Sequence, residues 1–399
     1  MTVPSPLRQH LLDLGAALAV YGPPELGVEL PEIVGDEIDL EYAALRKGCL
    51  LIDRPDRGTI QLKGPERLAF LNNMITQELK DMPQFGGLRS FWLNRKGRID
   101  ADLRVTNLDD LTFLDLDVHA VQRTLEGLQS FLIMEDAELT DETPSHHRLS
   151  LIGPTAGAML DSIGGPLFGS SPTEMPDGAA GMLVVGDQTV MVDRHDTAGV
   201  PGFELLVHRA GAVELWDRLM TARFDSEQAQ AGELSPLASK IRLRPGGWHA
   251  YNVARIEAGT PLFNLDFTTE SLPAETGVLE DRVSFTKGCY LGQEVVARMH
   301  SLGHPKQTLV ALRLAGDAAR EADGQPRQPL TGAPLRKTDQ DKVIGAITSS
   351  VVSPMLGATA IAFAIVKWGA HEPGTKLLVP AEGVEVEAEV QPQLRFLSD

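Results

Sequence analysis

The sequence predicts an α+β fold that ends in a small β-barrel. In the first part of the chain, strand-like and helix-like patterns mix without the regular alternation of a doubly wound sheet. After Pro305 the pattern changes to short strands separated by turn residues, which is typical of a small barrel. No short-period repeat is present, so the sequence disfavours solenoids and propellers. We therefore divide the chain into a body, residues 1–304, and a C-terminal barrel domain, residues 305–399.

Hydrophobic periodicity predicts the individual elements of the body. The segment Leu11–Val20 is apolar but too short to span a membrane, and we interpret it as an amphipathic first helix. Thr59–Lys63 alternates like a strand, and Pro65 suits the first position of the helix that follows. The other expected elements are a strand over Ile99–Val105, a helix over 118–132, a hairpin of Met182–Val185 with Thr189–Val192, a strand over Phe203–Val207, loops over 164–181 and 235–247, and barrel strands over 309–314, 343–348, 377–379 and 384–390.

Charge and cysteine content exclude several classes of protein. The net charge of -19 repels phosphate backbones, and no run of Lys and Arg opposes it, so direct nucleic-acid binding is disfavoured. The two cysteines, Cys49 and Cys289, cannot alone form a four-cysteine zinc or iron–sulfur site. Their number fits a reducing compartment, although a disulfide between them stays an alternative. With no targeting signal apparent, we expect a cytoplasmic protein with no membrane association.

The densest chemical signal lies around Cys289, in the run Lys287-Gly288-Cys289-Tyr290-Leu291-Gly292-Gln293-Glu294. The flanking glycines permit close backbone approach, and Lys287 is a cation able to lower the pKa of the thiol. The alternative is a small core cysteine, which is our interpretation of Cys49 in its apolar run. His300 and His304 follow four residues apart, but no second cysteine completes a metal site. The pair His146–His147 is expected in a solvated polar loop.

Carboxylates in apolar surroundings supply the other candidates. Glu204 interrupts the apolar strand Phe203–Val207, and a fixed carboxylate there can accept two parallel hydrogen bonds from an amino-pyrimidine edge such as that of a pterin. The alternative is a solvent-facing position on an edge strand. Arg255 and Glu257 either orient a ligand carboxylate or form an internal salt bridge. Asp100 and Asp102 lie on one strand face about 7 Å apart, a spacing that suits acid–base chemistry or, beside Arg104, a charge cluster.

Taken together, these residues resemble the glycine-cleavage T-protein (aminomethyltransferase) family along nearly the whole chain. The run from Lys287 to Arg298 is similar to the signature of the YgfZ branch of that superfamily, whose members bind tetrahydrofolate and support assembly or repair of iron–sulfur enzymes. Two positions depart from the T-protein pattern. Asp100-Ala101-Asp102 stands where T-proteins carry two adjacent aspartates, and Arg54-Pro55 stands where they have small polar residues. The matching blocks are Leu45-Arg46, Leu51–Asp53, Leu62–Gly64, Phe70–Asn72, Leu93–Gly97, Gly199–Glu204, Arg255–Gly259 and Val343–Gly345.

The resemblance implies a folate pocket in a body of two intertwined subdomains, followed by the barrel. It implies tetrahydrofolate or a folate derivative as cofactor, Glu204 as pterin anchor, and Arg255, Lys287 and Trp92 as further cofactor contacts. Cys289 then acts beside the pocket, with iron–sulfur assembly or client proteins as partners, and catalysis is not expected. The alternative is a tetrahydrofolate-dependent aminomethyl- or methyltransferase of the T-protein type, in which Asp102 is the electrostatic or acid–base group.

Overall fold

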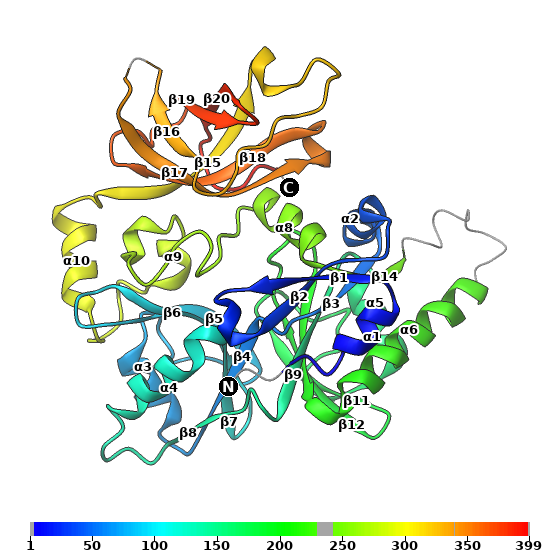
Figure 1. Cartoon of the computed structure of the whole chain (residues 1–399). Coiled ribbons are helices and arrows are strands. Elements are labelled where there is room, and N and C mark those ends of the chain that lie inside the picture. Colours follow the sequence, from blue (N-terminus) through cyan, green and yellow to red (C-terminus); the bar gives the residue numbers. More distant parts are fainter. Residues whose placement is uncertain (1–3, 230–241, 339, 398–399) are drawn as a thin grey trace. The chain divides into compact units, whose positions relative to one another are not determined.

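The computed structural model describes residues 4–229, 242–338 and 340–397, which fold into two compact units (Figure 1). The first unit comprises residues 1–74, 78–90 and 102–251. The second comprises residues 75–77, 91–101 and 252–399. Each unit is therefore assembled from separate pieces of the chain.

A seven-stranded sheet forms the centre of the first unit. Its strands lie in the order β10-β11-β12-β13-β9-β3-β14. Neighbours are antiparallel, except that β14 runs parallel to β3. The bounds are β10 Gly165–Phe168, β11 Ala180–Val185, β12 Gln188–Arg194, β13 Gly202–His208, β9 His146–Ile152, β3 Cys49–Asp53 and β14 Leu243–Gly246.

One face of this sheet is covered by α1 (Arg8–Asp13), α5 (Ala156–Ile163) and α6 (Ala212–Ala229), which lie together in Figure 1. Leu11, Met159 and Trp216 from the helices form one buried core with Leu151 and Leu205 from the strands. Because side chains alternate between the faces of a strand, the residues before and after these core positions point to the opposite face.

A second sheet contains five strands in the order β5-β6-β7-β4-β8. On β6, Ile99, Ala101, Leu103 and Val105 are fully buried, as the alternation predicts. The helices α3 and α4 contact β7, β4 and β8. The bounds are β4 Arg57–Lys63, β5 Gly86–Leu93, β6 Ile99–Asn107, β7 Leu111–Asp117, β8 Glu138–Asp141, α3 Arg67–Met74 and α4 Val121–Gln129, with a hairpin of β1 Ala16–Tyr21 and β2 Val28–Val34 and a helix α2 Ile38–Lys47.

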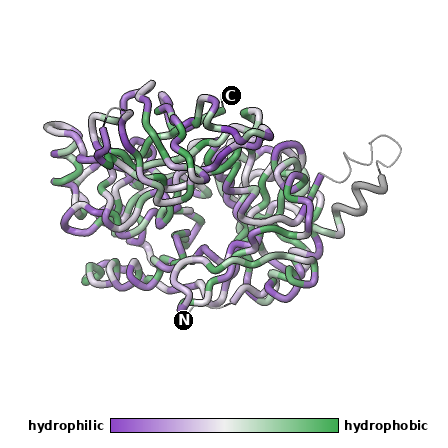
Figure 2. Tube along the Cα trace, turned by 45° about the horizontal axis from the view of Figure 1, so that its top comes forward, coloured by the Kyte–Doolittle hydropathy of each residue, from purple (hydrophilic) through white to green (hydrophobic). Residues whose placement is uncertain are grey.

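The second unit contains a closed barrel in the order β15-β18-β17-β16-β19-β20. Closure leaves no free sheet edge, and alternate residues such as Leu312, Leu377 and Val386 fill the core. Hydrophobic and hydrophilic residues accordingly alternate along the chain in Figure 2. The bounds are β15 Gln307–Ala315, β16 Pro334–Lys337, β17 Val343–Ser353, β18 Thr359–Lys367, β19 Lys376–Ala381 and β20 Val384–Val390, preceded by α8 Trp248–Glu257, α9 Leu279–Arg282 and α10 Gln293–Leu302.

These elements confirm the α+β class and the terminal barrel, and three local predictions are wrong. The segment Leu11–Val20 is not one helix, because Gly15 takes a positive φ of 81° after α1 and the chain continues as strand β1. The expected loop over 164–181 contains the edge strand β10. Of the expected loop over 235–247, residues 235–241 lie outside the described residues, and Leu243–Gly246 form strand β14.

Candidate functional site

Glu204 lies on the face of the seven-stranded sheet that the helices do not cover. Its neighbours Phe203 and Leu205 belong to the helix-facing core, so the Glu204 side chain points the other way. The pairing register sets Glu204 directly opposite Ser150 of β9 and Asp193 of β12. Directly paired residues share a face, so the three form a polar row across the sheet.

The polar face of the five-stranded sheet meets this row. Arg104 of β6 is buried and donates two hydrogen bonds to Asp193, at 2.9 Å from Nε and 2.6 Å from Nη2. Thr106, two residues further on the same strand face, donates to Asp193 at 3.1 Å. We call the space between these two polar faces, with the residues that line it, the inter-sheet layer.

The carboxylate of Glu204 is only partly satisfied within the inter-sheet layer. Ser150 Oγ donates to Oε1 at 2.7 Å, and Arg54 Nη1 lies 3.6 Å from the same oxygen. Oε2 is buried with no hydrogen-bond partner among the described residues. Burial raises the pKa of Glu204 above its ordinary value, an effect that the nearby Arg54 opposes.

Arg54 is held in place by other groups. Its guanidinium donates to both carboxylate oxygens of Asp56, at 2.9 and 2.8 Å, and to Ser150 at 3.1 Å. It also lies over the ring of Tyr251, 5.1 Å from the centroid. Because Arg54 already has a carboxylate partner, it does not neutralise Glu204 by itself.

Asp102 lies on the same polar face of β6, two residues before Arg104. Its side chain is buried, with Arg89 Nη2 3.7 Å from Oδ2. Ala101 is fully buried on the opposite face of the strand, and Asp100 accepts a hydrogen bond from Asn94 at 3.2 Å. Asp102 is therefore the aspartate of this motif that belongs, with Glu204, to the first unit.

The other expected site residues belong to the second unit. Arg255 is fully buried in an ion pair with Asp266 and donates to Ser349 Oγ at 2.7 Å. These contacts correspond to the internal salt bridge that the sequence left open as an alternative. Trp92 of β5 is also buried and pairs with Ile75 through an isolated bridge.

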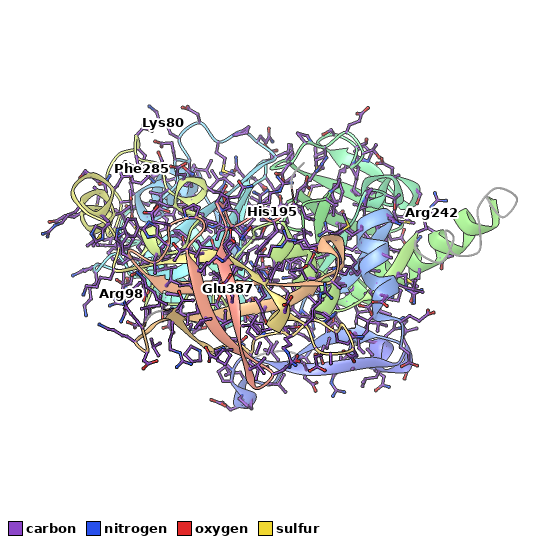
Figure 3. The ribbon with its side chains drawn as sticks, turned by 90° about the horizontal axis from the view of Figure 1, so that it is seen from above. Lys80, Arg98, His195, Arg242, Phe285 and Glu387 are labelled. Carbon is purple, nitrogen blue, oxygen red and sulfur yellow. The ribbon has the colours of Figure 1, made fainter. Side chains whose placement is uncertain are left out.

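Lys287 anchors the segment that carries Cys289. Its buried Nζ donates to the carbonyl oxygens of Ile75 at 2.7 Å and Gln77 at 2.8 Å, and it lies 5.2 Å from the Tyr290 ring centroid. Cys289 is free and exposed. Ahead of this segment, Phe285, which is labelled in Figure 3, stacks on His300 of α10, with ring centroids 3.9 Å apart. The thiol is thus presented by a backbone that its neighbours fix.

The glycine of this run has a conformational role. Gly292 adopts a φ of 81° directly before α10, and a Cβ there would lie 2.8 Å from the carbonyl oxygen of Asn94. Cys289 lies three residues before Gly292 and therefore precedes α10. Gly288, by contrast, has open space around it.

Cys49 and the histidines have structural surroundings. Cys49 is buried in the core, is not in a disulfide, and its pKa is raised to about 12 by burial. His147 is not in a solvated loop, because it lies buried on β9 with Nε2 2.5 Å from Asp53 Oδ1. His304 stacks on Trp368. Within residues 4–229, 242–338 and 340–397, no group of three His, Cys, Asp or Glu is arranged to hold a metal ion.

Sequence reasoning missed most of the residues that surround Glu204. Ser150, Arg54, Arg148 and Asp193 come from segments that are far apart in the sequence, and only strand pairing brings them together. The available signal in the sequence was the alternation of core-facing and outward-facing residues along a strand. Asp193 continues the period of the predicted strand Thr189–Val192 by one residue, onto the face opposite Val192.

No helix in the described part of the chain is long and apolar enough to cross a membrane.

Both the body and the barrel of this chain match domain families of the glycine cleavage T-protein. Residues 9–287 match the GCVT N-terminal domain family, and residues 309–396 match the glycine cleavage T-protein C-terminal barrel domain family. The aminomethyltransferase of Corynebacterium jeikeium (strain K411) is 27% identical over 397 residues, covering 96% of this chain and 93% of that protein. The aminomethyltransferase of Thermotoga maritima is 27% identical over 350 residues, covering 86% of each.

A solved structure shows the same fold. The glycine cleavage system aminomethyltransferase T from Bartonella henselae superposes with a TM-score of 0.81 at 21% identity, covering 100% of this chain and 98% of that one. The predicted fold is confirmed by this match and by the two domain matches. The chain is a member of the glycine-cleavage T-protein (GCVT) family.

Proposed function

We propose that this chain binds tetrahydrofolate in the inter-sheet layer, with Glu204 as the anchor of the pterin ring. The family as a whole binds tetrahydrofolate. The observation that carries the proposal is the buried, unpartnered Oε2 of Glu204. A buried acceptor without a donor costs about 1–3 kcal/mol, and the neighbouring N–H groups of a pterin supply the missing donors.

The residues fit this ligand in chemical type. Ser150 and Arg54 orient Oε1, which leaves Oε2 directed to a ligand donor. The bound folate supplies a carrier for one-carbon groups. The chain's own residues bind and orient its ring, and the burial of Glu204 excludes water from those hydrogen bonds. Lys287 and Trp92 remain proposed cofactor contacts, and Arg255 is proposed to act by holding its own segment through Asp266.

We further propose that the protein supports iron–sulfur protein assembly or repair, with Cys289 as the acting group. The exposed, free thiol and the anchoring of Lys287 support this role, because a reactive thiol needs both access and a fixed backbone. One thiolate cannot hold a cluster, so any ligation of a cluster requires a partner protein. The two free cysteines fit a reducing compartment, and we propose the cytoplasm.

An aminomethyltransferase activity is the second candidate. It is favoured by the names of the relatives, which are 27% identical over most of the chain, and by the burial of Asp102 on the polar face of β6. In that reaction Asp102 is the group beside the reacting carbon. Ala101 points to the apolar face, so a second adjacent carboxylate is absent from this position.

Calorimetric titration of tetrahydrofolate tests the folate proposal. We expect binding to the wild type in the micromolar range, a loss of about 10- to 100-fold in Glu204→Gln, and no change in the control Glu214→Gln. Glu214 is an exposed helix carboxylate paired with Arg218. Equal binding by wild type and Glu204→Gln rejects Glu204 as the anchor.

Two substitutions separate the two candidate functions. Folate-dependent turnover of an aminomethylated carrier protein that is abolished by Asp102→Asn but kept by Cys289→Ser establishes the transferase. Absence of turnover, together with failure of Cys289→Ser to restore iron–sulfur enzyme activity in a deletion strain, establishes the maturation role. Full rescue by Cys289→Ser eliminates the cysteine from it.

A further inference from the structure

The inter-sheet layer contains a second unpartnered polar atom, and its chemistry is opposite to that of Glu204. Nη1 of Arg148 is buried with no hydrogen-bond partner among the described residues. The Arg148 side chain is 2% exposed. A donor and an acceptor that are both buried and both unsatisfied, within one layer, indicate a ligand that carries one acceptor and at least one donor.

The strand register brings these two side chains close together. Glu204 pairs with Ser150 across β13 and β9, and Arg148 pairs with Leu206 two residues further along. Arg148 and Glu204 are therefore diagonal neighbours on one face of the sheet, a relation that spans about 7–8 Å between the two Cα atoms and lets long side chains reach the same group. Burial raises the pKa of Glu204, and the charge of Arg148 opposes that rise, which agrees with this proximity.

The remaining contacts of Arg148 do not account for its burial. Nη2 donates to Thr59 Oγ1 at a long 3.3 Å, and Nε lies 3.4 Å from Asp115 Oδ1. Asp115 already accepts a shorter hydrogen bond from Arg57 Nε at 2.9 Å. Asp115 is therefore shared between Arg57 and Arg148, and none of these contacts involves Nη1 of Arg148.

We propose that Arg148 is a specificity-determining residue, which donates from Nη1 to the ring carbonyl of a 2-amino-4-oxopyrimidine while Glu204 accepts from the adjacent ring N–H and amino group. This inference rests on the proposed folate function and deepens it. The ring edge presents two donors followed by one acceptor, the complement of a carboxylate beside a guanidinium. Pterins have this edge, and so does guanine.

A ring in which an amino group replaces the carbonyl tests the assignment. Such a 2,4-diamino ring presents a donor to the Arg148 donor and an unprotonated ring nitrogen to Glu204, so both residues contribute to its rejection. We expect the wild type to bind tetrahydrofolate about 10- to 100-fold more tightly than tetrahydroaminopterin. Arg148→Met is expected to reduce that ratio by at least about threefold, through loss of the Arg148 share and mainly by weakening tetrahydrofolate, and Arg148→Lys to restore part of it.

Controls keep the result interpretable. Arg218→Met removes a charge from an exposed helix pair and should leave the ratio unchanged. Arg57 keeps Asp115 paired in the Arg148 variants, and an unchanged thermal midpoint in Arg148→Lys identifies a folded protein. A folded Arg148 variant that keeps the wild-type ratio overturns the assignment.

Binding measurements with tetrahydrofolate and guanosine distinguish a failure of this inference from a failure of the proposed folate function. Tetrahydrofolate binding that is lost in Glu204→Gln, together with a ratio insensitive to Arg148, retains the folate function and rejects the role of Arg148. Guanosine binding that depends on both residues, without tetrahydrofolate binding, supports the recognition of the ring edge and rejects folate as the ligand.

Discussion

The ion pair between Arg104 and Asp193 joins the two sheets, and its contribution to the free energy of unfolding can be predicted from its geometry. Both side chains are buried, at 5% and 1% exposure, and two hydrogen bonds join them. Arg104→Met leaves Asp193 as a buried charge whose remaining hydrogen bond comes from Thr106. Breaking a buried pair from one side costs about 3–5 kcal/mol of unfolding free energy, which for a unit of this size lowers the thermal midpoint by about 6–20 °C.

A double substitution separates the pair from its packing. Arg104→Met combined with Asp193→Leu removes both charges and fills similar volume, so we expect a free energy of unfolding within about 1–2 kcal/mol of the wild type. Differential scanning calorimetry measures all three proteins, and Arg218→Met, from the exposed pair with Glu214, is a control expected to cost at most about 0.5 kcal/mol. The reasoning is refuted by an Arg104→Met midpoint within 2 °C of wild type, taken as roughly the effect of 1 kcal/mol, or by a double variant as unstable as the single one.

Three further predictions concern the candidate residues. Burial raises the pKa of Glu204, so the contribution of this carboxyl to stability is present below the ordinary glutamate pKa and is lost as pH rises through the raised pKa. Glu204→Gln should therefore raise the thermal midpoint of the ligand-free protein at neutral pH. A wild-type thermal midpoint that stays unchanged from acid to neutral pH contradicts this. Iodoacetamide should label Cys289 in the native protein and Cys49 only after unfolding, because Cys49 is buried and burial raises its pKa to about 12. Mass spectrometry of the two cysteine-containing peptides measures the labelling, and labelling of both cysteines in the native protein contradicts the prediction. Gly292→Ala should cost about 1–3 kcal/mol through backbone strain at positive φ, whereas the matched Gly288→Ala should cost less than 1 kcal/mol; equal urea midpoints for the two variants count against that role of Gly292.

Local periodicity was sufficient to predict much of the fold. The alternation over Ile99–Val105 identifies β6, and it assigns Asp102 and Arg104 to one face correctly, because the pleat of a strand is a property of the strand itself. The same reasoning failed at Leu11–Val20. That segment is apolar enough for a helix, but pairing with β2 makes its second half a strand. Non-local pairing overrode the local pattern there.

The candidate site was predictable only in part, for the same physical reason. Glu204 is visible in the sequence because a carboxylate within an apolar strand needs a partner or a ligand. Its neighbours Ser150 and Asp193 are set by the registers of β9 and β12 against β13, which no local pattern specifies. The burial of His147 was missed because its partner, Asp53, is distant in the sequence and its local surroundings are polar.

The inter-sheet layer also bears on why these polar residues are present. Two sheets pack most favourably through apolar faces, and a buried ion pair is at best a modest source of stability. The Arg104–Asp193 and Arg54–Asp56 pairs are at least complete, since each cation meets both oxygens of its carboxylate. Glu204 is different, because burying an oxygen without a donor opposes folding. Stability therefore does not explain Glu204, and the proposed ligand would supply the donor that its Oε2 lacks.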